Sequence, residues 1–159
     1  MAAVEDYNFD TASAGASETI PMEAGQIRKG GLIMIKGQPC KVSEVSTSKT
    51  GKHGHAKCNF IAYNIFNNKK LEDMIPSTHG TTVPVVSRNE YTLMDITDEG
   101  FMSLMDEEGS TREDLKLPDH PENYKFELQK EFDDGKTLIL TVLKACGQEQ
   151  VMSHKVDAE

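Results

Sequence analysis

The chain lacks the features by which membrane-spanning and secreted proteins are recognised. Its 159 residues contain no apolar run near the roughly 20 residues that a helix needs to cross a bilayer, and the start, Met1–Asp6, is acidic without an apolar signal region. The three cysteines, Cys40, Cys58 and Cys146, form no Cys-x-x-Cys pair and are odd in number, which favours reduced thiols in a reducing compartment. We therefore expect a cytoplasmic protein, with the nucleus as a second location, and no membrane span.

Catalytic motifs are missing too. The chain has no GxSxG nucleophile elbow, no HExxH zinc motif and no glycine-rich dinucleotide fingerprint. Its acidic stretches Asp106–Glu108 and Glu113–Asp114 fall at predicted turn or edge positions, where carboxylates are usually solvated. The sequence thus predicts that the protein is not an enzyme.

The net charge of −9 is distributed unevenly. Residues 1–17 carry three acids and no Lys or Arg, residues 18–84 carry nine Lys and Arg against five Asp and Glu, and residues 85–159 carry eight against eighteen. A basic first half suits nucleic acid, and an acidic second half would be held away from phosphate. A solvated acidic surface that aids solubility explains the second half equally well.

The stretch Ser46–Lys57 contains no aliphatic side chain larger than alanine, so it has little to bury. Strand-like runs lie on both sides of it. Gly51 and Gly54 inside it supply backbone angles that other residues avoid. The pattern predicts a hairpin loop with Lys52 at its tip.

This loop is also cationic. Its lysines, Lys49, Lys52 and Lys57, have no internal counter-charge, because no carboxylate lies between Glu44 and Glu72. A hairpin tip of this composition is often merely solvated. The sharper interpretation is a cationic finger for an anionic partner such as RNA.

Three kinds of site can be weighed for this loop. A phosphate-binding P-loop is excluded, because Ser46 and His53 stand where that motif needs glycine and Ser or Thr. A zinc site from His53, His55 and Cys58 is disfavoured, since it lacks a convincing fourth ligand and matches no standard spacing. The third is a lysine used for its reach and charge, either directly on RNA or as a site of covalent extension.

The string Ser-Thr-Ser-Lys-Thr-Gly-Lys-His-Gly-His-Ala-Lys at 46–57 resembles the hypusine loop of eukaryotic translation factor five-A, a family of hypusine-containing initiation and elongation factors. The similarity extends along nearly the whole chain. The segments that carry it are Ile27–Gly30, Lys36–Lys41, Lys70–Asp73, Pro76–His79 and Arg112–Pro118. The chain departs from the family pattern in three places. Gly80 stands where asparagine is common, Asn64 stands where aspartate is usual, and the segment His120–Phe132 is divergent.

The resemblance implies a covalent modification rather than a bound cofactor. Lys52 would receive an aminobutyl group from spermidine and then be hydroxylated, which gives hypusine. The enzymes implied are deoxyhypusine synthase and deoxyhypusine hydroxylase.

The resemblance also implies the partners and the action. The protein would bind the large ribosomal subunit and peptidyl-tRNA, and modified Lys52 would steady the acceptor end of the tRNA in the peptidyl site. It would thereby promote peptide-bond formation at stalling sequences such as consecutive prolines and assist termination. The sequence leaves the oligomeric state open between a monomer and a weak dimer. The residues expected to contact RNA are Lys49, Gly51, Lys52, His53, Gly54, His55 and Lys57.

The predicted fold is mostly β, in two small barrels. Residues 1–20 are expected to be a disordered acidic tail, and residues 21–84 an SH3-like barrel that carries the loop 46–57. Pro76, Gly80 and Pro84 are interpreted as a linker. The aromatic side chains of the barrel are expected to lie in the core rather than to stack on nucleic-acid bases; they are Phe60, Tyr63 and Phe66.

Residues 85–159 are expected to form an OB-fold with one helix, because three strands, a helix and two strands follow one another. Asp119 is the candidate helix cap, with Pro121 in the first turn. The residues expected to line the buried face of the helix are Tyr124, Leu128 and Phe132, and those expected to fill the second core are Met94, Met102 and Met105.

Overall fold

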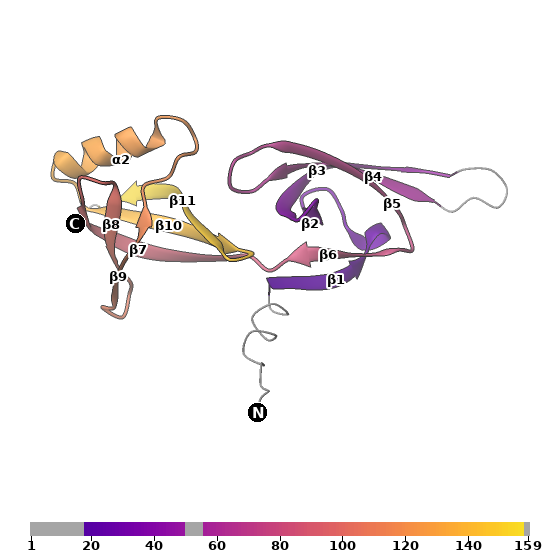
Figure 1. The fold of residues 1–159 in the computed structure, drawn as a ribbon, viewed down its shortest axis with the longest axis horizontal. Helices are drawn as coiled ribbons and strands as arrows, with labels where there is room; N and C mark the ends of the chain where they lie inside the picture. The colour runs from indigo at the N-terminus through magenta and orange to yellow at the C-terminus, as the bar shows by residue number, and fades with distance from the viewer. Residues whose placement is uncertain (1–17, 50–55, 158–159) are drawn as a thin grey trace, which may run out of the picture. The chain divides into compact units, whose positions relative to one another are not determined.

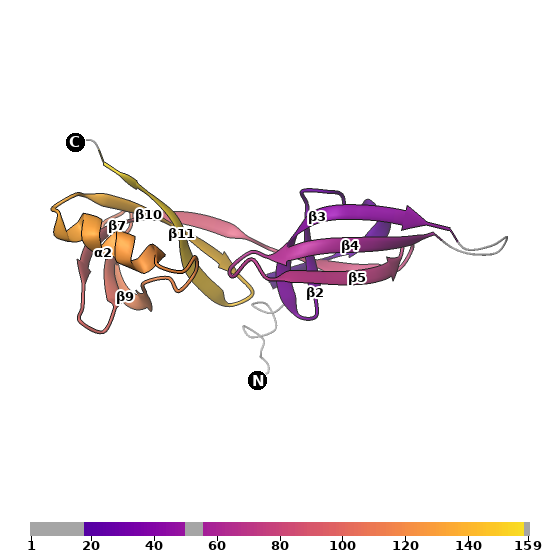
Figure 2. The same cartoon turned by 90° about the horizontal axis from the view of Figure 1, so that it is seen from above.

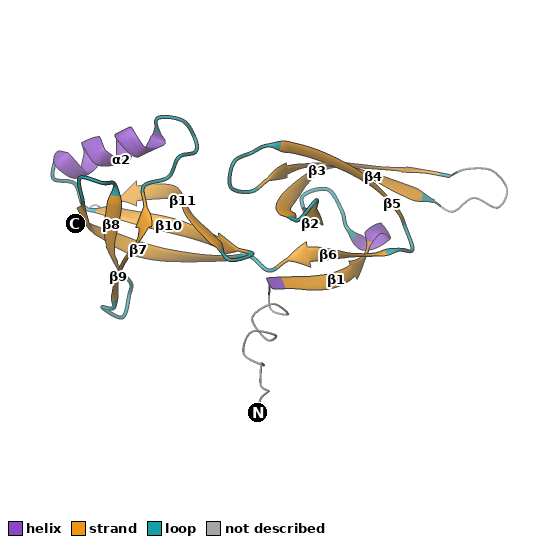
Figure 3. Cartoon of the chain, viewed as in Figure 1, coloured by secondary structure: helices purple, strands orange, loops and turns teal. Residues whose placement is uncertain are grey.

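The structure, a computed structural model, describes residues 18–49 and 56–157. The backbone falls into two compact units, Met1–Val85 and Val86–Glu159, and each has its own hydrophobic core (Figure 1). The division lies one residue beyond the predicted boundary after residue 84. Strands predominate in both units (Figure 3). Within the described residues, no helix has the length and apolar character needed to span a membrane.

The first unit contains a four-stranded antiparallel sheet in the order β2-β3-β4-β5 and a two-stranded sheet of β1 and β6. Its elements are β1 (Thr19–Glu23), η1 (Ala24–Gln26), β2 (Leu32–Ile35), β3 (Gln38–Ser48), β4 (Lys57–Asn64), β5 (Lys70–Pro76) and β6 (Gly80–Pro84). The larger sheet curls around a core of ten buried residues that includes Ile33, Ile35 and Phe60. This is the small β-barrel that the sequence predicts.

The alternation of side chains explains how these strands are oriented. In β4, Cys58, Phe60 and Ala62 are buried while the residues between them are not, because successive side chains of a strand point to opposite faces. β2 and β3 are joined by Lys36 and Gly37, whose φ angles of 52° and 77° are those of a two-residue type I′ hairpin turn. Figure 2 shows β3, β4 and β5 side by side.

Two strands of the first unit were not expected. Thr19 and Ile20, assigned to the tail, lie in β1, and the predicted linker from Gly80 to Pro84 is β6, which pairs with β1. Residues 1–17 of the predicted tail lie outside the described residues. The prediction failed because proline and glycine usually interrupt strands, whereas a two-stranded sheet consists of edge strands, where proline is tolerated.

Asn64 is the last residue of β4. Its side chain is 8% exposed, and its Oδ1 accepts hydrogen bonds from the backbone N–H of Phe66 at 2.7 Å and of Asn67 at 3.2 Å. Its Nδ2 donates to Gln38 Oε1 at 2.9 Å. These bonds turn the chain and place Phe66 in the interior, so Phe60 and Phe66 are core residues, as favoured, and Tyr63 is half-buried.

The second unit is a five-stranded antiparallel sheet in the order β11-β10-β7-β8-β9 with one helix packed on it. Its elements are β7 (Ser87–Ile96), β8 (Phe101–Met105), β9 (Thr111–Lys116), α2 (Tyr124–Asp133), β10 (Leu138–Ala145) and β11 (Gln148–Val156). Register shifts between β7 and β8, between β8 and β9 and between β10 and β11 are irregularities of the kind that bends a sheet. The order and curvature are those of the predicted OB-fold.

The helix packs as its periodicity predicts. Leu128 is fully buried in the second core, and Tyr124 and Phe132, four residues away on either side, pack against it. The predicted cap of the helix was wrong. The residue before α2 is Asn123, with a left-handed φ of 76°, and Asp119 makes a 3.9 Å ion pair with Lys125 instead of capping the helix.

The predicted methionine core is right only in part. Met102 is fully buried and Met105 is half-buried, but Met94 is 49% exposed. The neighbouring Leu93 is 4% exposed, and Met94 points to the other face of the sheet because successive side chains of a strand alternate.

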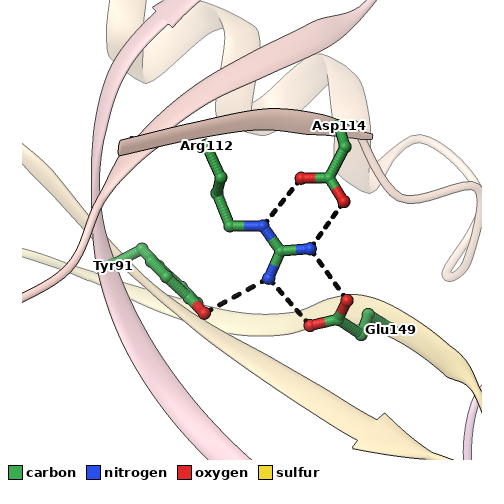
Figure 4. Close-up of polar contacts among 4 residues, drawn as sticks. All are labelled: Tyr91, Arg112, Asp114 and Glu149. Carbon is green, nitrogen blue, oxygen red and sulfur yellow. Dashed lines mark hydrogen bonds and ion pairs between the residues drawn. The ribbon is translucent and has the colours of Figure 1, made fainter. Parts of the chain in front are cut away.

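Arg112 joins the two edges of the second sheet (Figure 4). It lies on edge strand β9, and its guanidinium donates at 2.9 and 2.8 Å to both carboxylate oxygens of Glu149 on the opposite edge strand, β11. It also donates twice to Asp114 at 2.7 Å and once to Tyr91 Oη at 3.2 Å. The Arg112 network therefore bridges two strands that share no backbone ladder.

The acidic stretches expected to be simply solvated also have structural contacts. Asp106 Oδ1 accepts hydrogen bonds at 2.9 Å from the backbone N–H groups of Glu108 and Ser110, which closes the turn between β8 and β9. Asp114 belongs to the Arg112 network, although its side chain is 64% exposed. Glu107, Glu108 and Glu113 are exposed, as predicted.

Candidate nucleic-acid interface

The predicted hairpin consists of β3 and β4. Their last paired residues are Ser48 and Lys57, so residues 49–56 connect the two strands. Lys49 and Ala56, at the two ends of this connection, are described, and Lys49 is exposed. Most of the predicted loop residues, namely Gly51, Lys52, His53, Gly54 and His55, lie outside the described residues. What the structure defines is the base from which they start.

This base has no negative charge. Three rows of paired residues run across β3, β4 and β5 from the hairpin end, beginning with Ser48, Lys57 and Pro76. The next two rows contain only Thr47, Cys58, Ile75, Ser46, Asn59 and Met74. The first carboxylate, Asp73, lies in the fourth row. The strand register therefore converts the carboxylate-free stretch of the sequence into a carboxylate-free end of a sheet.

The base is also held by backbone hydrogen bonds from outside the hairpin. Ser77 N–H donates to Ala56 O at 2.8 Å, and Ser77 O accepts from Gly25 N–H at 2.9 Å. A Cβ added to Gly25 would lie 3.0 Å from Ser77 O, which is tighter than ordinary van der Waals contact, so glycine favours this close approach. The turn η1 and the segment after β5 thus fix the end of β4 to the rest of the unit.

A hollow of about 490 Å³ lies beside the hairpin base. Its apolar lining includes Ile27 and Cys58, both buried, and Arg28 and Lys29 contribute two exposed cations to it. The positions of Arg28 and Lys29 near the loop were not predicted from the sequence.

Among the described residues, four exposed cations therefore lie at this end of the unit: Arg28, Lys29, Lys49 and Lys57. None of them forms an ion pair within 4.0 Å with any residue that the structure describes. Elsewhere in the first unit, Lys70 pairs with Glu72 at 3.7 Å. Unpaired cations on an exposed end produce a positive potential that attracts phosphate.

The cysteines of the first unit are structural. Cys40 is fully buried, its Sγ donates to Gln38 O at 3.4 Å, and burial raises its pKa. Cys58 is 3% exposed and belongs to the core. The disfavoured zinc site would have used Cys58 with His53 and His55, and these two histidines lie outside the described residues.

The fold and the charged hairpin define a class: a two-barrel β-protein, an SH3-like unit with one cationic end followed by an OB-fold. Two family models match the chain. "Translation initiation factor 5A-like, N-terminal" covers residues 17–79, and "Eukaryotic elongation factor 5A hypusine, DNA-binding OB fold" covers residues 85–155. The chain belongs to the eukaryotic translation initiation factor 5A family, whose members are named as translation factors.

Individual members of this family are similar to the chain along most of its length. The chain is 52% identical over 151 residues to eukaryotic translation initiation factor 5A-1 of Arabidopsis thaliana, covering 95% of each chain. It is 51% identical over 157 residues to the Spodoptera exigua factor, covering 99% of this chain and 97% of the relative. Among solved structures, a translation initiation factor eIF-5a family protein from Naegleria fowleri matches with a TM-score of 0.83 and 46% identity, over 87% of this chain and 99% of that one.

Proposed function

We propose that the protein is a non-catalytic factor of the cytoplasmic ribosome that acts through a hypusine on Lys52. Its unpaired cations at the hairpin base are the observation that carries this proposal. Lys49 and Lys57 border the loop, Arg28 and Lys29 lie beside it, and none of the four forms an ion pair within 4.0 Å with a described residue. Such an end is suited to a surface dense in phosphate, as ribosomal RNA and tRNA are.

The modification would extend what this end can reach. An aminobutyl group transferred from spermidine lengthens the Lys52 side chain and adds a second amine to it. A hairpin held at its base by η1 and Ser77 would carry that extension as far as the acceptor end of a tRNA in the peptidyl site. There its charge and donors would hold the tRNA end in reacting geometry without taking part in bond making.

Poor substrates should benefit most. Consecutive prolines react slowly, so orientation of the peptidyl-tRNA limits their rate, and the same support would assist termination. Deoxyhypusine synthase and deoxyhypusine hydroxylase are the modifying enzymes in this proposal, and the large ribosomal subunit with peptidyl-tRNA is the target. Lys49, His53, His55 and Lys57 would add contacts to phosphate near the tip.

The test is a translation system built from purified components that lacks the cell's own factor. Protein carrying hypusine at Lys52 and the same protein without it are compared on a message with consecutive prolines. We expect the modified form to raise the rate of product formation by about tenfold or more and the unmodified form to have little effect. Equal activity of the two forms would disprove the hypusine mechanism. Intact-mass measurement of protein from its native source establishes whether the modification is present.

Charge reversal at the hairpin base should weaken ribosome binding. We expect the double substitution Lys49→Glu and Lys57→Glu to lower affinity for ribosomes by about 10²-fold and to reduce the slope of log affinity against log salt by about 2, one for each phosphate that the variant no longer neutralises. Lys36→Glu is the matched control, because Lys36 lies in the turn before β3, at the other end of that strand. Binding that falls equally in the control would show a nonspecific charge effect.

Gly51 is predicted to need a left-handed backbone. We expect Gly51→Ala to slow modification of Lys52 by about tenfold, because an L-residue in that conformation costs roughly 1–2 kcal/mol. The measurement is a time course of intact mass with deoxyhypusine synthase and spermidine. Ala56→Gly, at the other end of the loop, should be modified at the wild-type rate. A Gly51→Ala variant that matches the wild type would contradict the predicted turn.

A further inference from the structure

A polar cluster in the second unit lies between helix α2 and strand β11, and the proposed function does not use it. His154 on β11 has a side chain only 10% exposed, and its Nε2 lies 3.0 Å from Glu131 Oε2 and 3.8 Å from Glu127 Oε2, both on α2. Figure 1 shows this helix packed along the sheet that contains β11. Glu127 and Glu131 are four residues apart, so the helix presents both carboxylates on one face.

No Lys or Arg in the part of the chain that the structure describes forms an ion pair with these carboxylates. Among the ion pairs of the described residues, Glu127 and Glu131 occur only with His154. The lysines of the helix pair elsewhere: Lys125 with Asp119 at 3.9 Å and Lys130 with Asp134 at 3.2 Å. With a neutral imidazole the cluster carries two negative charges, which a divalent cation would neutralise.

Tyr124 fixes the ring of His154. Its Oη lies 2.6 Å from His154 Nδ1, on the side of the imidazole away from the carboxylates, and the two ring centroids are 5.5 Å apart. A partner on the second ring nitrogen is what orients a metal-binding histidine in known sites.

We propose that His154, Glu131 and Glu127 form a binding site for a zinc-type divalent cation that clamps α2 to β11. The ligand atoms of the three residues all lie within 4.8 Å of one another. Ligands about 2.1 Å from a tetrahedral metal are about 3.4 Å apart, and the Nε2–oxygen separations lie on either side of that value. Imidazole nitrogen with carboxylate oxygens is a ligand set for zinc rather than for magnesium or calcium.

The hydrogen atoms must be arranged differently in the two states. Without metal, neutral His154 can donate Nε2–H to Glu131 while Nδ1 accepts from Tyr124 Oη–H. A metal on Nε2 requires the other tautomer, in which Nδ1–H donates to Tyr124 Oη. Three protein ligands leave one tetrahedral position for water.

The test is calorimetric titration of chelator-treated, full-length protein with ZnCl2. His53→Gln and His55→Gln are introduced into every sample, so that the loop histidines cannot compete. We expect one zinc per chain, unaffected by millimolar Mg²⁺. His154→Gln should lower the affinity by at least 100-fold, Glu131→Gln by about tenfold or more, and Tyr124→Phe by about 10-fold to 100-fold through the ring orientation. His120→Gln, elsewhere in the unit, should bind as the parent does.

Two readouts decide the outcome even if His154→Gln folds poorly. Glu127 is 58% exposed, so Glu127→Gln should leave the circular dichroism spectrum unchanged while weakening zinc binding. Nitrogen-15 NMR of the imidazole should show Nε2 bound to metal and Nδ1 protonated. Failure of the parent to take up one zinc, or uptake that neither His154→Gln nor Glu127→Gln reduces, would overturn the proposal.

Discussion

Substitution of Lys52 by arginine is expected to abolish the effect of the protein on stalled ribosomes while both units stay folded. Arginine keeps the positive charge, but its guanidinium stays protonated and offers no free amine to which an aminobutyl group can be attached. The variant should keep its unmodified mass after treatment with deoxyhypusine synthase and spermidine. Its rate on a consecutive-proline message should fall to the rate without factor. Intact mass and product formation measure the two effects.

Lys49→Arg is the matched control for this prediction. Lys49 is exposed at the base of the same loop, and arginine there preserves its charge. We expect this variant to be modified at Lys52 and to work at close to the wild-type rate. A fully active Lys52→Arg variant would refute the modification mechanism. Loss of activity in both variants would show that the loop does not tolerate arginine, whatever the chemistry at Lys52.

Short-range patterns in the sequence predicted most of the fold. Leu32–Ile35 and Phe101–Met105 form strands, as expected for short apolar runs between turn residues, because such runs are local signals. The buried face of α2, with Leu128 at its centre, followed from four-residue spacing. The family resemblance added the order of the two barrels, which the comparisons support.

Features that depend on distant partners were missed. β6 forms because β1, more than fifty residues away in the sequence, pairs with it. Pro84 considered alone predicts an interruption of the strand. Arg28 and Lys29 reach the hairpin base only through the packing of η1 against Ser77. The residues of the proposed zinc site come from a helix and a strand that no spacing rule connects.

The Arg112 network gives the largest expected effect on stability. Arg112→Met is expected to lower the free energy of unfolding of the second unit by about 2–3 kcal/mol, which corresponds to a melting temperature lower by roughly 10–20 °C. Removing one partner of a buried pair costs about 3–5 kcal/mol, but Arg112 is 24% and Glu149 is 20% exposed, so the cost is discounted for solvent screening. Urea unfolding followed by circular dichroism measures it.

Two comparison variants identify the cause. Lys130→Met removes the exposed pair with Asp134, whose side chains are 76% and 47% exposed, and should cost less than about 0.5 kcal/mol. Adding Glu149→Leu to Arg112→Met should recover part of the stability, because the unpaired carboxylate is then gone. A double variant less stable than Arg112→Met alone would contradict an electrostatic origin and indicate poorer packing.

The pH dependence provides an independent check. Hydrogen bonds from Arg112 lower the pKa of Asp114 and of Glu149 from their ordinary values of 3.8 and 4.5. A carboxylate whose pKa is lower in the folded state stabilises the fold above its ordinary pKa and loses that contribution as pH falls through the lowered value. The stability difference between wild type and Arg112→Met should therefore be full above about pH 5 and shrink as the solution becomes more acidic. A difference that stays constant into acid would show that the ion pairs do not hold the two edge strands together.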